Sequence, residues 1–181
     1  MTRRSRLSGI AVFVLRFAII APVCLFVWWL ILPGYAWAIG QISGMALIHL
    51  RGAPIEAMRV VTDPEGVLNV RTGLIYYMNS TQREIAIVYL VSNLPSFLIL
   101  VLATPRLQLR RRIRALSIGL SVLAVGHVAF IVMAFTMTDS GNGAPQAVGT
   151  FLLTLPFLLW LALVYWEELS GLIGSPPHNV Q

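Results

Sequence analysis

Four long apolar runs with very few charged side chains constrain this chain more than any other feature. They lie at about 10–32, 85–103, 115–135 and 147–166. Each run has about 19–23 residues, which at about 1.5 Å per residue suffices for a helix to cross the ~30 Å core of a bilayer. Only 11% of the 181 residues are charged, whereas soluble domains carry about 25%. The runs therefore predict four transmembrane helices in a single integral membrane domain, 1–181.

The basic residues predict how these helices are oriented. All 13 are arginines, and nine of them lie either in the first 16 residues or between positions 104 and 114. The other four lie in the 33–84 loop, among acidic residues: Arg51, Arg59, Arg71 and Arg83. Cytoplasmic loops carry the excess of arginine and lysine in membrane proteins. We therefore expect both termini and the 104–114 loop in the cytoplasm and the 33–84 loop outside. Arginine without lysine is typical of GC-rich bacterial genomes, so we expect a bacterial inner membrane.

The segment Tyr35–Leu50 is apolar but has only 16 residues. If it crossed the bilayer, the arginine-rich 104–114 loop would move outside, against the charge rule. An outer interfacial or re-entrant helix is therefore favoured. The alternative is a helix that continues the first span after a bend at Pro33-Gly34. Gly40 and Gly44 are four residues apart, so either helix would have one face that allows close packing.

A small β-hairpin is predicted in the outer loop. Met58–Thr62 and Val67–Thr72 have strand-like composition, and the turn sequence Asp63-Pro64-Glu65-Gly66 separates them. A lone hairpin is marginally stable, so we expect it to pack on the 35–50 helix or on the lipid interface. The predicted fold class is thus an all-α integral membrane protein: a four-helix transmembrane bundle with an outer interfacial helix and a small β-hairpin.

Several residues within the predicted spans are unusual for hydrocarbon. Asn93 must face another helix or a backbone carbonyl that a proline leaves unpaired, and Pro95 and Pro156 are expected to kink their helices. His127 has two interpretations. An ionisable group inside a membrane is a functional candidate by default, but a neutral imidazole bonded to a carbonyl or to Asn93 would be structural. Gly126 and Gly119 should let neighbouring helices approach the third span closely.

A polar and aromatic cluster lies where the outer loop enters the second span. As a functional site, it would contact a partner protein or an extended peptide substrate through Tyr76, Tyr77, Asn79 and Arg83. As a purely structural feature, Ser80 or Thr81 would cap the following helix. An enzyme interpretation would need a hydroxyl nucleophile, which Ser80 would supply. Ser80 and His127 are therefore the candidate catalytic residues.

Other kinds of site find no support in the sequence. His49, His127 and His178 lie far apart, and no HExxH spacing or phosphate-binding loop occurs. We therefore predict no metal and no cofactor. Cys24 is the single cysteine and lies deep in an apolar run, where a thiol packs as a small hydrophobe. The net charge of +6 comes from arginines at the ends of spans, so the expected partner is membrane lipid and not nucleic acid.

Taken in order, residues 35–135 resemble the exosortase/archaeosortase family of multi-pass membrane transpeptidases. The resemblance is carried by Leu50-Arg51-Gly52-Ala53-Pro54-Ile55-Glu56 after an outer apolar helix, and by a two-strand stretch before the next span. A basic loop from Thr104 to Arg114 and the helix Ala115–Phe135 complete it.

The catalytic residues of that family do not carry over. The family would place its nucleophilic cysteine near Tyr77–Ser80 and its catalytic arginine near Gly126-His127. This chain has no cysteine at the first position and no arginine at the second. The resemblance therefore implies a non-catalytic accessory protein of an exosortase-type sorting system, similar to exosortase H-associated membrane proteins. Its partner would be an exosortase-type enzyme or the substrate's signal. The alternatives are an intramembrane transpeptidase- or peptidase-like enzyme using Ser80 or His127, and a small transporter subunit.

Overall fold

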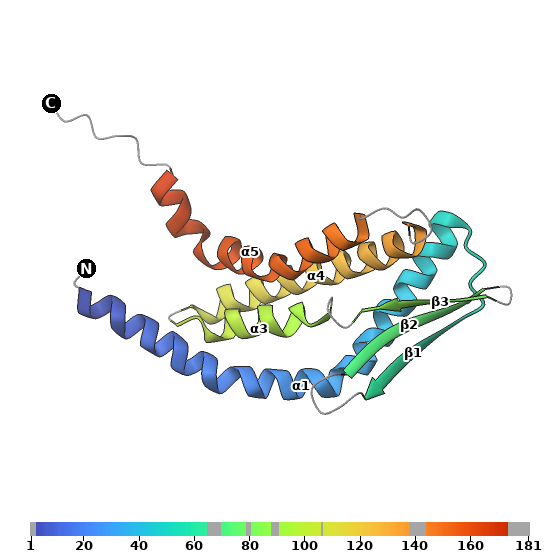
Figure 1. Ribbon diagram of the computed structural model, residues 1–181. Helices are drawn as coiled ribbons and strands as arrows, with labels where there is room; N and C mark the ends of the chain where they lie inside the picture. The colour runs from blue at the N-terminus through green and yellow to red at the C-terminus, as the bar shows by residue number, and fades with distance from the viewer. Residues whose placement is uncertain are drawn as a thin grey trace.

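The computed structural model describes residues 3–64, 70–78, 81–87, 91–105, 107–137 and 144–173. Within these ranges the chain forms four helices and one antiparallel sheet. Their order is α1 (Arg3–Arg51), β1 (Ala57–Pro64), β2 (Val70–Met78), β3 (Thr81–Ala86), α3 (Asn93–Ala103), α4 (Leu109–Met137) and α5 (Ala144–Ile173). Figure 1 shows the helices running side by side and the sheet lying at one end of them. The mostly helical architecture with a small β element agrees with the sequence prediction.

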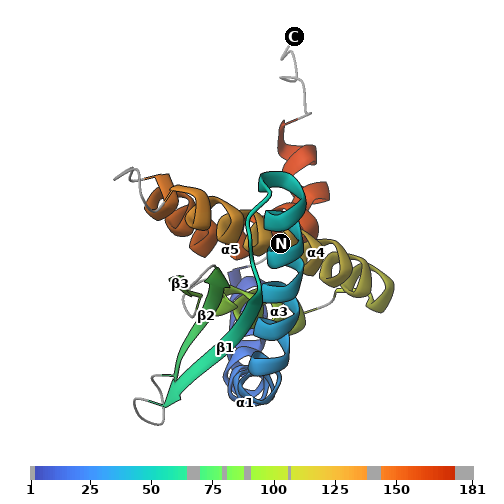
Figure 2. The same ribbon diagram turned by 90° about the vertical axis from the view of Figure 1, so that its right-hand side faces the viewer.

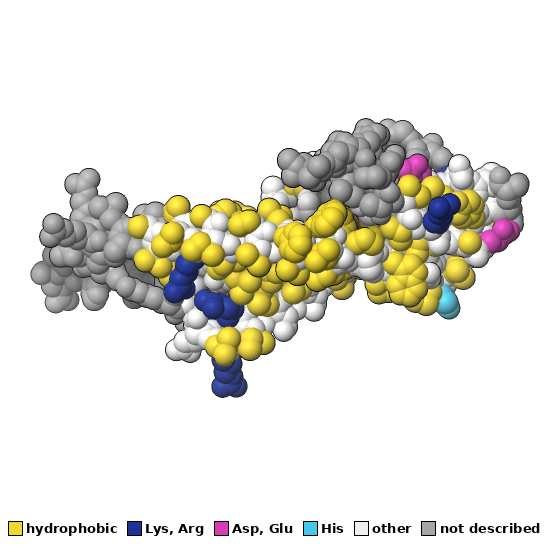
Figure 3. Space-filling view, turned by 90° about the horizontal axis from the view of Figure 1, so that it is seen from below, with side chains coloured by type: hydrophobic (Ala, Val, Ile, Leu, Met, Phe, Trp, Pro, Cys, Tyr) yellow, Lys and Arg dark blue, Asp and Glu magenta, His cyan; other side chains and the backbone are white. Residues whose placement is uncertain are grey.

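Three of the helices described are long and apolar enough to cross a membrane: Ala11–Arg51 within α1, Leu109–Met137 and Ala147–Tyr165. Large apolar side chains on them face outwards, and Val14 and Val125 are 57% and 69% exposed. Figure 3 shows apolar side chains over a long stretch of surface, with basic groups near one end and mixed charges near the other. Soluble proteins rarely expose so much contiguous apolar surface. These features indicate a membrane protein.

The segment Tyr35–Leu50 does not form the separate helix that the favoured interpretation expected, and the alternative of a helix that continues the first span is confirmed. It continues the first helix without a break, and Pro22 and Pro33 both lie inside α1. Figure 1 shows α1 changing direction along its length. A proline inside a helix commonly produces a bend of this kind. This part of α1 is stabilised by packing because its buried residues recur at helical spacing on one face. They are Ala36, Ile39, Gly40, Ser43, Gly44 and Leu47.

The second predicted span, 85–103, is also corrected. Its first residues belong to β3, and α3 begins only at Asn93. With 11 residues, α3 is about 17 Å long, so by itself it covers only about half of a ~30 Å core. Pro95 lies in the first turn of α3, where a missing N–H breaks no helical bond, so it does not kink the helix as predicted. α3 instead fills the space between α1, α4 and α5, all of which it contacts.

The predicted hairpin is one part of a three-stranded sheet with strand order β1-β2-β3. Paired residues on neighbouring strands share a face of the sheet, so the register defines two sides. The inner face, which packs on α1, carries Met58, Tyr76 and Arg83 in one row and Val60, Leu74 and Ile85 in the next. The outer face carries Arg59, Ile75 and Glu84 in one row and Ala57, Tyr77 and Gln82 in the next.

The sheet can lie close to α1 because α1 has glycines at the contact. A methyl group on Gly40 would come within 2.8 Å of Met58 Cε and 2.9 Å of Leu74 Cδ2. One on Gly44 would lie 3.5 Å from Tyr76 Cε1. The close packing predicted for these two glycines is confirmed, and the neighbour is the sheet. Figure 2 shows the strands beside the C-terminal half of α1.

The ends of the helices fall into two groups at opposite ends of the molecule, as the predicted topology requires. The start of α1, the α3–α4 connection and the end of α5 point towards one end of the molecule, and the sheet lies towards the other (Figure 1). The arginines of α4, Arg110, Arg111, Arg112 and Arg114, therefore lie far from Arg51, Arg59 and Arg83. Which of these ends faces the cytoplasm remains a prediction from the charge rule.

Candidate functional site

A chain of hydrogen bonds joins all four helices in the interior. The Tyr35 hydroxyl of α1 lies 2.7 Å from His127 Nδ1 of α4. His127 Nε2 lies 2.9 Å from Asn93 Oδ1 of α3, and Asn93 Nδ2 donates to the carbonyl of Leu152 in α5 at 3.0 Å. We call these four groups the polar chain. His127 and Asn93 are buried, with 0% and 3% of their surface exposed.

One protonation state satisfies the whole polar chain. The amide oxygen of Asn93 only accepts hydrogen bonds, so Nε2 of His127 must carry the proton and donate it. Nδ1 is then an acceptor, and it receives the Tyr35 O–H. His127 is thus held as a neutral imidazole between a phenol and an amide. The predicted pairing of His127 with Asn93 is confirmed.

The last bond of the polar chain compensates for a proline. In an α-helix the carbonyl of residue 152 would accept the backbone N–H of residue 156. Residue 156 is Pro156, which has no N–H. The Asn93 amide supplies the missing donor, as expected for an asparagine facing a carbonyl that a proline leaves unpaired. The arrangement joins α3 to α5, so what the polar chain does chemically is hold helices together.

Close helix packing surrounds the polar chain. A methyl group on Gly119 of α4 would overlap the Phe97 ring of α3, and one on Gly126 would come within 2.9 Å of Leu152 Cδ2 in α5. Both glycines thus allow the close approach that the sequence predicts.

The second polar region lies where β3 meets the end of α4. Arg83 donates a hydrogen bond from its guanidinium to the Phe135 carbonyl, and its guanidinium carbon lies 5.2 Å from the centre of the Phe135 ring. Tyr76 packs edge-on against the same ring and donates its hydroxyl to the Gly40 carbonyl at 3.1 Å. Burial raises the pKa of Tyr76 to about 12. These contacts fix the sheet to both α1 and α4.

The predicted contact cluster is therefore divided between the two faces of the sheet. Tyr76 is 0% exposed, so its side chain is a core group that no external partner touches; its assignment as a contact residue is corrected. Arg83 is half-buried on the same inner face, and half-buried Tyr77 lies on the outer face. Asn79 and Ser80 lie outside the described residues. Thr81 starts β3 and donates to the Met78 carbonyl at 2.9 Å, so it caps no helix.

At the arginine-rich end, basic side chains also hold backbone carbonyls. Arg111 donates to the Val164 carbonyl at 2.9 Å and Arg112 to the Thr104 carbonyl at 3.0 Å. Trp160 Nε1 donates to the Thr104 hydroxyl at 2.9 Å. These bonds tie α4 to α5 and to the connection after α3. The sequence predicted an orienting role for these arginines but not these contacts.

No group of three or more His, Cys, Asp or Glu side chains that could hold a metal ion occurs in the part of the chain that the structure describes. Cys24 is buried within α1. No protein-family model, curated protein or solved structure matches this chain.

Proposed function

We propose that this chain is a non-catalytic inner-membrane accessory protein of an exosortase-type sorting system. In this proposal it contacts the enzyme, or the substrate's signal, at the end of the molecule that carries the sheet. The family assignment rests on the sequence resemblance over residues 35–135. The observation that carries the proposed mode of action is a sheet fixed to two helices, with one face turned away from them.

The outer face of the sheet is the contact surface in this proposal. It combines a half-buried aromatic, Tyr77, and a half-buried aliphatic, Ile75, with the exposed polar side chains of Arg59, Gln82 and Glu84. Neither Ile75 nor Tyr77 belongs to the described core cluster beneath the sheet. An aromatic residue surrounded by charged and amide groups is typical of the residues that dominate binding at protein interfaces.

The geometry at His127 supports the non-catalytic part of the proposal. A general base must be able to reach a reacting proton, and a nucleophile needs a base beside it. The bonds of the two ring nitrogens to Tyr35 and Asn93 occupy them within the bundle. In this proposal His127 therefore serves packing.

Co-purification from mild detergent tests the proposal, with an exosortase-type enzyme from the same cells as bait. We expect specific recovery of the wild-type chain and a loss of recovery of more than about tenfold for Tyr77→Ala combined with Arg59→Glu, since interface aromatic and arginine residues each contribute on the order of 1–2 kcal/mol. Gln108→Ala, an exposed change at the opposite end, is the matched control. Recovery of the wild type at background level would remove the partner assignment.

A further inference from the structure

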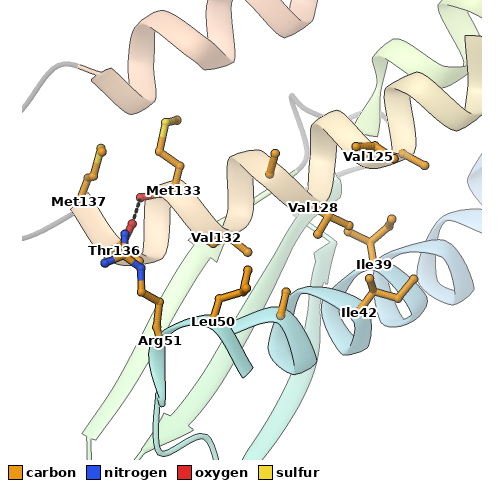
Figure 4. A pocket seen from close by; sticks show the side chains of 13 residues that line it. Ile39, Ile42, Leu50, Arg51, Val125, Val128, Val132, Met133, Thr136 and Met137 are labelled. Atoms are coloured by element: carbon orange, nitrogen blue, oxygen red, sulfur yellow. Dashed lines mark hydrogen bonds between the residues drawn. The ribbon is translucent and has the colours of Figure 1, made fainter. Parts of the chain in front are cut away.

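A groove between the C-terminal halves of α1 and α4 has a volume of about 600 Å³ and an almost wholly aliphatic lining. α1 contributes Ile39, Ile42, Ala46 and Leu50, and α4 contributes residues from Ala124 to Met137. Figure 4 shows Val128 and Val132 of α4 on the side of the helix towards Ile39, Ile42 and Leu50 of α1. From Ile39 to Arg51 the groove follows α1 for about 18 Å, close to the ~15 Å depth of one leaflet's hydrocarbon.

Polar groups occupy one end of this groove. Arg51 and Thr136 line it there, and Figure 4 shows the Arg51 side chain extending towards Thr136. The same two residues line a second, adjoining cavity of about 390 Å³, whose lining also includes Arg83 and Thr81. An aliphatic groove thus leads directly into a polar cavity with two guanidinium groups.

The position of Thr136 along α4 places this junction at a membrane surface. Ala115 is the first residue after the arginines of α4, and Thr136 lies about 32 Å further along the helix. That length matches the ~30 Å hydrocarbon core. If the arginines lie at one surface, Arg51 and Thr136 lie at the opposite headgroup level, where phosphate groups of lipids are found.

We propose that the groove and the adjoining polar cavity together form a binding site for one anionic phospholipid. One acyl chain lies along Ile42, Val128 and Val132, and the phosphate is bound by Arg51 with Arg83 beside it. A guanidinium binds phosphate with paired, charge-assisted N–H donors. Arg83 is suited to this role because its bond to Phe135 O and its contact with the Phe135 ring fix its position.

Native mass spectrometry of the full-length protein in detergent tests this site without any partner enzyme, so its result is independent of the sorting proposal. Phosphatidylglycerol and phosphatidylcholine with identical acyl chains are the two probes. We expect phosphatidylglycerol to bind about tenfold more tightly, because both lipids carry the phosphate but the choline cation of phosphatidylcholine is repelled by the two guanidinium groups. Equal binding of the two lipids would overturn the proposal.

Two variants and a control locate the site. Arg51→Gln should weaken phosphatidylglycerol binding about tenfold. Ala129→Trp, which fills the groove from the exposed side of α4, should weaken both lipids. Arg59→Gln removes the same charge from the outer face of the sheet and should leave the binding of both lipids unchanged. An equal effect of Arg59→Gln and Arg51→Gln would overturn the site.

Inorganic phosphate separates the headgroup from the whole lipid. If the groove contributes as proposed, millimolar phosphate will not displace phosphatidylglycerol from the wild-type protein. Displacement would show that the anion alone is recognised and would overturn the lipid assignment. Thermal unfolding of each variant shows that a loss of binding does not come from a loss of folding.

Discussion

The side-chain amide of Asn93 takes the place of the backbone N–H that Pro156 lacks. It donates to the Leu152 carbonyl at 3.0 Å from a different helix, and its oxygen receives His127 Nε2 at 2.9 Å. In hydrocarbon no water is present to satisfy an unpaired carbonyl. The proline and the asparagine, 63 positions apart in the sequence, therefore depend on each other.

A double-mutant cycle measures that dependence. Asn93→Leu should destabilise the protein by about 1–3 kcal/mol, because it removes the partner of His127 Nε2 and of the Leu152 carbonyl. In a Pro156→Ala background residue 156 again supplies an N–H, so the cost of Asn93→Leu should fall by about 0.5–1.5 kcal/mol. Unfolding titrations in mixed micelles give the four free energies. Strict additivity of the two changes would contradict the relationship.

His127 should be replaceable by a side chain that keeps its hydrogen bonds. His127→Gln retains a donor and an acceptor, so we expect it to lose less stability than His127→Leu, which removes the partner of the Tyr35 hydroxyl and of Asn93 Oδ1 at a cost of about 1–3 kcal/mol. The same unfolding titration compares the two. If His127→Gln kept the fold yet abolished function in the host pathway, a catalytic role would return.

Part of this site was predictable from the sequence because hydrocarbon leaves few choices. Asn93 and His127 are polar groups in apolar runs, so each needed a hydrogen-bond partner inside the protein. The two side chains are hydrogen-bonded to each other. Tyr35 was missed as the third member because it is 92 residues from His127 and an aromatic near the end of a span usually marks the interface.

The missed strand has a different cause. Thr81–Ala86 reads Thr-Gln-Arg-Glu-Ile-Ala, which has too few apolar residues to show an alternating pattern. Its strand conformation comes from pairing with β2, a tertiary effect that local composition does not reveal. A signal for β2 was present in the aromatic and β-branched run Leu74-Ile75-Tyr76-Tyr77. Similarly, the charge rule favoured a separate helix at 35–50, but this segment continues α1 and packs against the sheet.

Two glycine substitutions test the helix packing. Gly119→Ala should cost about 1–3 kcal/mol, because the new methyl group would overlap the rigid Phe97 ring. Gly34→Ala is the matched control in α1, since nothing lies within 4 Å of its new methyl group. It should be neutral or stabilising by up to about 1 kcal/mol through helix propensity. Equal effects on thermal unfolding would show that α3 does not lie against α4 as described.

Alkaline pH should loosen the sheet through Tyr76. Burial raises its pKa from the ordinary value of 10.0 to about 12. Between these pH values the unfolded chain releases the phenolic proton while the folded chain retains it, so the free energy of unfolding falls as pH rises. Below pH 10 this contribution is constant. Thermal unfolding at pH 9 and pH 11 should show a smaller loss for Tyr76→Phe than for the wild type, and identical losses would contradict the buried position.

We propose that the arginine-rich end faces the cytoplasm and that the sheet lies on the other side of the membrane. The most direct measurement is labelling of single cysteines with a membrane-impermeant maleimide, in a Cys24→Ser background. Gln82→Cys marks the outer face of the sheet and Gln108→Cys the α3–α4 connection, and both positions are exposed. The account predicts labelling of Gln82→Cys in intact spheroplasts and of Gln108→Cys only after lysis. The reverse pattern, or labelling of both before lysis, would contradict it.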